Sequence, residues 1–118
     1  PFSPIDITKI RRRSVYYGYI VDSKKSLEVD EVMLTVMPSP KSYTKEDTAE
    51  ISCHGNPIIL QEILNILIKA GARMAGPGEF TKRAFLNGRI SLSQAEAVME
   101  IINARTKESV YSALQDLK

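Results

Sequence analysis

Four side chains at the predicted strand ends and loops could bind a ligand: Glu50, His54, Asn87 and Arg89. Glu50 lies in an otherwise apolar or small-residue strand, near its C-terminal end, where its carboxylate could accept two parallel N–H bonds from an aminopyrimidine-like ring. A solvent-facing strand residue is an equally good interpretation. Arg89 closes an Asn-Gly-Arg corner, and its guanidinium could pair with a ligand carboxylate or only face water.

Cys53 and His54 are adjacent, but they do not have the pattern of a catalytic or metal-binding pair. Successive strand residues point to opposite faces, so the imidazole cannot activate the thiol, and the chain has no second histidine. We therefore predict a buried structural cysteine. His54 is consistent both with hydrogen bonding in the His-Gly-Asn-Pro turn and with lining a site before a helix N-terminus.

The Gly76-Pro77-Gly78 loop matches nucleotide-binding motifs only in part. Gly71 and Gly76 have the glycine spacing of a P-loop, but Pro77-Gly78 stands where the Lys-Ser/Thr pair is required. A dinucleotide fingerprint fails as well, because Thr81 replaces its last glycine and proline removes one amide. The loop is therefore not predicted to bind a nucleotide.

A run of three arginines, Arg11–Arg13, precedes a strand that contains Tyr16, Tyr17 and Tyr19. Guanidinium groups bind phosphates and aromatic rings stack on bases, so a nucleic-acid surface is one interpretation. We favour a solvated strand edge, because tyrosine is a common strand residue. The formal net charge is only +2, too small for a general nucleic-acid field.

The elements that position these residues follow from periodicity and capping signals. Residues 14–21 and 27–37 alternate as two antiparallel strands, and 48–53 predicts a third. Asn56 before Pro57 predicts the start of a helix over 57–70 that ends at Gly71. A short helix is predicted over about 79–86, followed by an Asn-Gly turn.

The last predicted element is a long helix. Ser93 and Glu96 form a capping-box pattern, and small or apolar residues then recur every three or four positions. The stripe consists of Ala95, Met99, Ile102, Thr106, Val110, Ala113 and Leu117. Roughly 25 residues at 1.5 Å each exceed what a small domain needs, so we expect the distal half to contact a partner or a further domain.

Composition indicates one ordinary globular domain. The chain has 118 residues, of which 43% are hydrophobic and 25% charged, and its one cysteine cannot form an internal disulfide. It carries neither a signal-like segment nor an apolar run long enough for a membrane span, and we expect a cytoplasmic protein.

Four motifs in order give the chain a specific resemblance. They are Tyr-Thr-Lys-Glu-Asp at 43–47, Glu-Ile-Ser-Cys-His-Gly-Asn-Pro at 50–57, the Gly-Pro-Gly to Asn-Gly-Arg segment at 73–90, and Leu-Ser-Gln-Ala-Glu-Ala at 92–97. Together they resemble the N-terminal domain of the tRNA-modifying GTPase family MnmE, also called TrmE. Any one motif alone would be weak, but four at the right intervals are highly specific.

This resemblance implies an α+β fold with a mixed β-sheet packed by helices, similar to the folate-binding domain of aminomethyltransferases. It implies a homodimer that binds a tetrahydrofolate derivative, 5-formyl- or methylene-tetrahydrofolate, with Glu50 and Arg89 as cofactor-binding residues and His54 and Asn87 as further candidates. Residues 1–90 would form this domain, and 91–118 a helix leading to helical and GTPase parts. Those parts would hold GTP, magnesium and potassium, and the parent enzyme would modify the tRNA wobble uridine with the flavoprotein MnmG.

The chain also departs from the family pattern. Many members have lysine where Arg89 stands, so the positive charge is kept but its geometry changes. The family's first strand, with a glycine-rich stretch and a folate-contacting arginine, does not precede Pro1, and the P-loop is absent too. The folate site is therefore expected to be incomplete in this chain. A tRNA-docking module and a purely structural dimerisation scaffold are the alternative functions.

Overall fold

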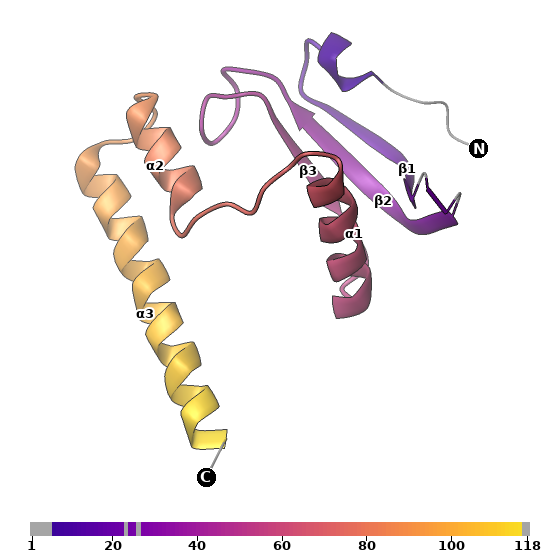
Figure 1. Ribbon diagram of the computed structural model, residues 1–118. Helices are drawn as coiled ribbons and strands as arrows, with labels where there is room; N and C mark the ends of the chain where they lie inside the picture. The colour runs from indigo at the N-terminus through magenta and orange to yellow at the C-terminus, as the bar shows by residue number, and fades with distance from the viewer. Residues whose placement is uncertain (1–5, 23, 26, 117–118) are drawn as a thin grey trace. The chain divides into compact units, whose positions relative to one another are not determined.

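Three strands form one sheet in the order β1-β2-β3 in the computed structural model (Figure 1). The structure describes residues 6–22, 24–25 and 27–116, without the side chains of Thr106 and of residues 109–116. The strands are β1 (Ser14–Asp22), β2 (Leu27–Met37) and β3 (Thr48–Ser52). All three predicted strands are present, with ends within one residue of those expected from the sequence.

Both strand pairs are antiparallel, as the alternation of the first two strands predicted. The α+β class is confirmed, but the prediction of a mixed sheet is wrong for the described residues. The reason lies in the connections. A parallel pair needs a crossover of a dozen or more residues, whereas only four residues join β1 to β2 and ten join β2 to β3.

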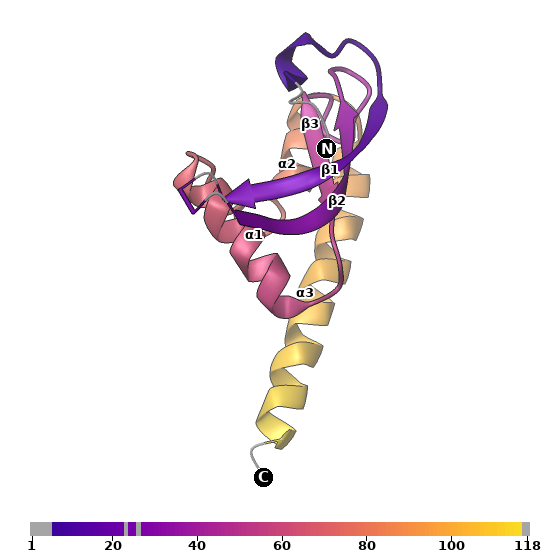
Figure 2. The same cartoon turned by 90° about the vertical axis from the view of Figure 1, so that its right-hand side faces the viewer.

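The two faces of the sheet differ in burial. Helix α1 (Pro57–Lys69) packs against β2 on one face, where Val32, Val36 and the helix residue Ile63 are buried (Figure 2). The register places Val15 and Tyr17 on the opposite face, and both side chains are more than half exposed. Alternation along β1 therefore separates a covered face from an open one.

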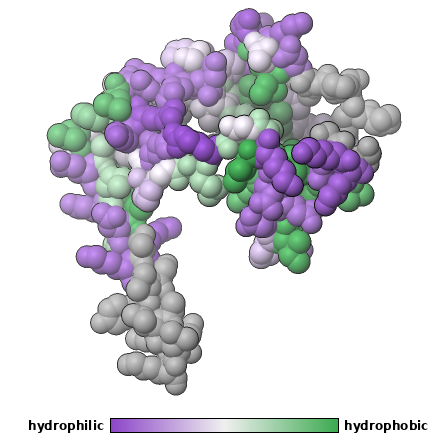
Figure 3. Space-filling model, viewed as in Figure 1, coloured by the Kyte–Doolittle hydropathy of each residue, from purple (hydrophilic) through white to green (hydrophobic). Residues whose placement is uncertain are grey.

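Helix α1 begins and ends where its capping residues predict. The Asn56 side chain accepts a hydrogen bond from the Ile58 N–H at 2.8 Å, and Pro57 occupies the first helical position. Gly71 follows the end with φ of 113°, a conformation that favours glycine. Several apolar side chains on this helix remain exposed, Ile58 most of all, and Figure 3 shows hydrophobic surface there.

A second compact unit contains α2 (Glu79–Leu86) and α3 (Leu92–Asp116). It comprises Tyr43–Lys45 and Ala75–Lys118, whereas the sheet and α1 belong to the first unit. The core of the second unit includes Ala84 of α2 and Ala95 of α3. The short and long helices predicted from the sequence are both present.

The long helix begins earlier than predicted. Ser91 Oγ accepts a hydrogen bond from the Gln94 N–H at 3.1 Å, and Gln94 Oε1 accepts one from the Ser91 N–H at 2.8 Å. This reciprocal pair is the capping box, so the assignment to Ser93 and Glu96 is wrong. Of the predicted stripe, Ala95 is buried and Met99 and Ile102 are half-buried. The side chains of Thr106, Val110, Ala113 and Leu117 lie outside the described residues.

Candidate functional site

Glu50 is exposed at the centre of β3 rather than near its end. It is the third of five residues in the strand and pairs with Thr35 of β2, which in turn pairs with Val15 of β1. This row lies on the open face of the sheet. Within the described part of the chain, no hydrogen bond or ion pair involves the Glu50 side chain. Its carboxylate oxygens are therefore accessible to an external N–H donor.

His54 is fixed to β2 by two contacts with one carboxylate. Its backbone N–H donates to Asp30 Oδ2 at 3.0 Å, and its Nδ1 lies 2.8 Å from Asp30 Oδ1. The backbone hydrogen bond is the largest cause that lowers the pKa of Asp30 below its ordinary value. Asn56 N also donates to the His54 carbonyl at 2.8 Å, which closes the predicted turn.

The imidazole of His54 remains 72% exposed despite this contact. It borders an open pocket of about 370 Å³ that Tyr17 and Met33 also line. The His54 backbone thus takes part in the turn, while its ring lines the pocket. Cys53 lines the same pocket and is half-buried, so it is less buried than predicted.

Asn87 and Arg89 both reach the segment Tyr43–Lys45. Asn87 Nδ2 donates to the Thr44 carbonyl at 2.8 Å. The guanidinium carbon of Arg89 lies 5.1 Å from the centre of the Tyr43 ring, within the range of a cation–π contact. The structure therefore brings together two of the four predicted site residues through a segment about forty positions earlier in the chain.

The Gly-Pro-Gly loop is held by its own neighbours. The Gly76 N–H donates to Glu79 Oε1 at 2.9 Å, and the Glu79 carboxylate also forms an ion pair with Arg83 at 3.0 Å. Gly78 has φ of 70°, and a Cβ there would lie 2.3 Å from Met99 Sδ. The loop therefore needs glycine at this position for its backbone and for close packing.

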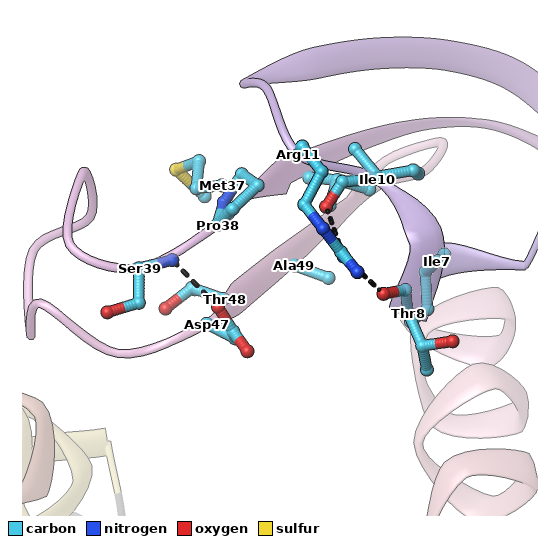
Figure 4. A pocket seen from close by; sticks show the side chains of 11 residues that line it. Ile7, Thr8, Ile10, Arg11, Met37, Pro38, Ser39, Asp47, Thr48 and Ala49 are labelled. Atoms are coloured by element: carbon cyan, nitrogen blue, oxygen red, sulfur yellow. Dashed lines mark hydrogen bonds between the residues drawn. The ribbon is translucent and has the colours of Figure 1, made fainter.

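A second pocket of about 370 Å³ lies in the first unit, and none of the four predicted site residues lines it (Figure 4). Its lining comes from η1 (Ile7–Lys9), the residues that follow it, the end of β2 and the start of β3. Arg11 donates to the Thr8 carbonyl at 2.7 Å and so is partly engaged by backbone. Asp47 accepts from the Ser39 N–H at 2.7 Å on the other side of the pocket.

Sequence reasoning missed Asp30 and Tyr43 as supporting residues. Asp30 had no distinguishing signal in the sequence, because Glu28 and Glu31 of the same strand are carboxylates too. The only sequence signal for Tyr43 was its place in the Tyr-Thr-Lys-Glu-Asp motif. Among the described residues, no three His, Cys, Asp or Glu side chains are grouped so that they could hold a metal ion. No helix in the same part of the chain is long and apolar enough to cross a membrane.

Residues 3–89 match the family described as GTP-binding protein TrmE N-terminus. The chain belongs to this family. Relatives named tRNA modification GTPase MnmE include one from Lactiplantibacillus plantarum, 54% identical over 98% of this chain, and one from Enterococcus faecalis, 52% identical over 95%. A third, from Acetivibrio thermocellus, is 52% identical over 96%.

The TrmE N-terminal match covers the three strands, α1 and α2, and ends at Arg89. It therefore includes all four predicted site residues. The chain spans about a quarter of the length of the relatives, 25% of the protein from L. plantarum and 24% of that from E. faecalis.

Proposed function

We propose that this chain is the tetrahydrofolate-binding and homodimerising domain of a cytoplasmic tRNA-modifying GTPase. The observation that carries the proposal is the TrmE N-terminal match over residues 3–89, together with identities above 50% to proteins named tRNA modification GTPase MnmE. In this proposal the parent enzyme hydrolyses GTP with magnesium and potassium in a separate domain. It acts with the flavoprotein MnmG on the wobble uridine.

The available side chains fit a folate. The Glu50 carboxylate accepts no hydrogen bond within the described residues. Both of its oxygens can therefore accept the two N–H bonds that an aminopyrimidine ring donates. Arg89 is exposed and offers planar N–H donors to a carboxylate. His54 and Asn87 are assigned supporting positions, because each is hydrogen-bonded to another segment. When bound, the folate would supply the one-carbon unit of the modification.

Calorimetric titration of the purified protein with 5-formyltetrahydrofolate tests this proposal. We expect saturable binding, weakened about tenfold or more in Glu50→Gln, because an amide cannot accept two N–H bonds with the charge of a carboxylate. Glu28→Gln is the matched control, since Glu28 is an exposed carboxylate on β2 of the same sheet. Wild-type affinity in Glu50→Gln would remove Glu50 from the site, and no binding by the wild type, either alone or with the family's N-terminal strand restored, would overturn folate binding.

The alternative is a tRNA-docking surface, which the open sheet face favours. Tyr17 is 63% exposed on that face, and Arg12 and Arg13 are exposed just before β1. Binding through phosphates weakens steeply between about 50 and 200 mM salt, whereas a folate site responds much less. A tRNA titration at both salt concentrations, with Arg12→Ala/Arg13→Ala as the variant, separates the two functions. Binding of neither ligand would leave a dimerisation scaffold.

A further inference from the structure

The segment Tyr43–Lys45 belongs to the second compact unit although its chain neighbours belong to the first. The Tyr43 hydroxyl lies 3.2 Å from Thr81 Oγ1, across 38 positions of sequence. Asn87 Nδ2 donates to the Thr44 carbonyl at 2.8 Å. The segment is therefore held to α2 and to the turn that follows α2.

The Tyr43 ring contacts Arg89, the stronger of the two predicted ligand-binding residues that reach this segment. It lies 5.1 Å from the guanidinium carbon of Arg89, while its hydroxyl is held by Thr81, which is only 5% exposed. One end of the tyrosine is thus fixed by a buried partner, and its face meets an exposed cation. This arrangement limits the orientations that the guanidinium can adopt, and the guanidinium keeps its positive charge.

A guanidinium held over a ring by a cation–π contact keeps its N–H donors available. The cation–π contact uses none of the N–H donors as hydrogen bonds, so a carboxylate can still bind them at the edge of the guanidinium plane. The same ring attracts a lysine ammonium only as a point charge and does not orient donors in a plane. The contact with Tyr43 therefore suits arginine at position 89.

We propose that Tyr43 is a positioning residue that presents the Arg89 guanidinium to the carboxylate of an anionic ligand. The inference rests on the proposed function, in which that ligand is a folate and the carboxylates are those of its glutamate. Thr81 is the anchor that fixes the ring, and Asn87 holds the backbone beside it. Tyr43 itself forms no bond with the ligand in this scheme.

A double-mutant cycle measured with 5-formyltetrahydrofolate tests the positioning role. We expect Tyr43→Leu to weaken binding about two- to fivefold, the worth of an exposed cation–π contact, and Tyr43→Phe to weaken it less because the ring remains. In an Arg89→Ala background Tyr43→Leu should have no effect on affinity. An equal loss in both backgrounds would show a merely structural role and overturn the inference.

Two further variants provide matched comparisons. Phe80→Leu also replaces an exposed aromatic ring with leucine, in the same unit as Tyr43, and should leave folate affinity unchanged. Arg89→Lys keeps the positive charge but not the planar guanidinium, so its folate affinity should fall by about the same two- to fivefold. This variant tests the inference even if Tyr43→Leu does not fold. Wild-type affinity in Arg89→Lys would overturn the positioning role of the Tyr43–Arg89 contact.

A readout without ligand separates this inference from folate binding. In the wild type and in Tyr43→Phe, ring currents should shift the Arg89 side-chain NMR signals upfield, and Tyr43→Leu should abolish that shift. The inference is overturned if Arg89 gives the same signals in the wild type and in Tyr43→Leu. If the shift is present but the wild type does not bind 5-formyltetrahydrofolate, the folate proposal fails while the Tyr43–Arg89 contact stands.

Discussion

Asp30 and His54 are joined twice, through the backbone N–H of His54 at 3.0 Å and through its Nδ1 at 2.8 Å. The two residues are 24 positions apart, and their contact fastens the turn after β3 to β2. A single carboxylate therefore holds the first residue of the His-Gly-Asn-Pro turn and, through that turn, the start of α1.

This contact predicts a pH dependence of stability. The His54 N–H lowers the pKa of Asp30 in the folded state, so the contribution is fully present above the unfolded pKa of about 3.8. It is lost as the pH falls through the lower folded value. We expect Asp30→Asn to reduce stability at pH 7 and to flatten its decline in acid, measured by urea unfolding from pH 7 to pH 2.5.

Glu62→Gln is the control for that measurement, because it removes an exposed carboxylate of α1 in the same unit. Its acid profile should remain close to that of the wild type. If Asp30→Asn loses stability in acid as steeply as the wild type, the contact does not contribute to the pH dependence.

The N-cap of α1 predicts a loss that depends on one side-chain oxygen. Asn56 Oδ1 accepts the Ile58 N–H at 2.8 Å, so Asn56→Ala should destabilise the protein by about 1 kcal/mol. Asn56→Ser retains an oxygen acceptor and should remain within a few tenths of a kcal/mol of the wild type. Urea unfolding followed by circular dichroism measures both, and equal losses in the two variants would argue against capping.

Ser91 and Ser93 offer a direct comparison at the start of α3. Ser91→Ala removes the acceptor of the Gln94 N–H and should cost about 1 kcal/mol, again from chemical unfolding. Ser93 is exposed inside the first turn of α3, so Ser93→Ala should change stability by less than about 0.5 kcal/mol. A larger loss in Ser93→Ala than in Ser91→Ala would support Ser93 as the N-cap, as predicted from the sequence.

Gly78 and Gly88 separate backbone strain from steric overlap. Both have positive φ, 70° and 76°, so alanine at either should cost about 1–2 kcal/mol. At Gly78 the new Cβ would also lie 2.3 Å from Met99 Sδ, whereas nothing lies within 4 Å at Gly88. Gly78→Ala should therefore lower the thermal midpoint further than Gly88→Ala.

The overlap at Gly78 can be checked with a second substitution. Met99→Ala removes the clashing sulfur, so the Gly78→Ala/Met99→Ala variant should lose less stability than the sum of its single changes. Additive losses would mean that Met99 moves aside at no cost and that only backbone strain acts at Gly78.

The sequence by itself determined the elements and most of their ends. Alternation over 27–37 gave β2 with both ends correct, and Asn56 with Pro57 gave the first residue of α1. These signals depend on residues within a few positions of one another, so they can be recognised without knowledge of the fold. The four motifs determined the family for the same reason.

The tertiary structure decided which distant residues meet. The sequence Ser-Leu-Ser-Gln-Ala-Glu at 91–96 contains two capping-box patterns, and the structure forms the one made by Ser91 and Gln94. Likewise, no local pattern places Tyr43 on Arg89 or His54 on Asp30. Such contacts depend on how the chain returns after dozens of residues, and periodicity over a few positions carries no information about that return.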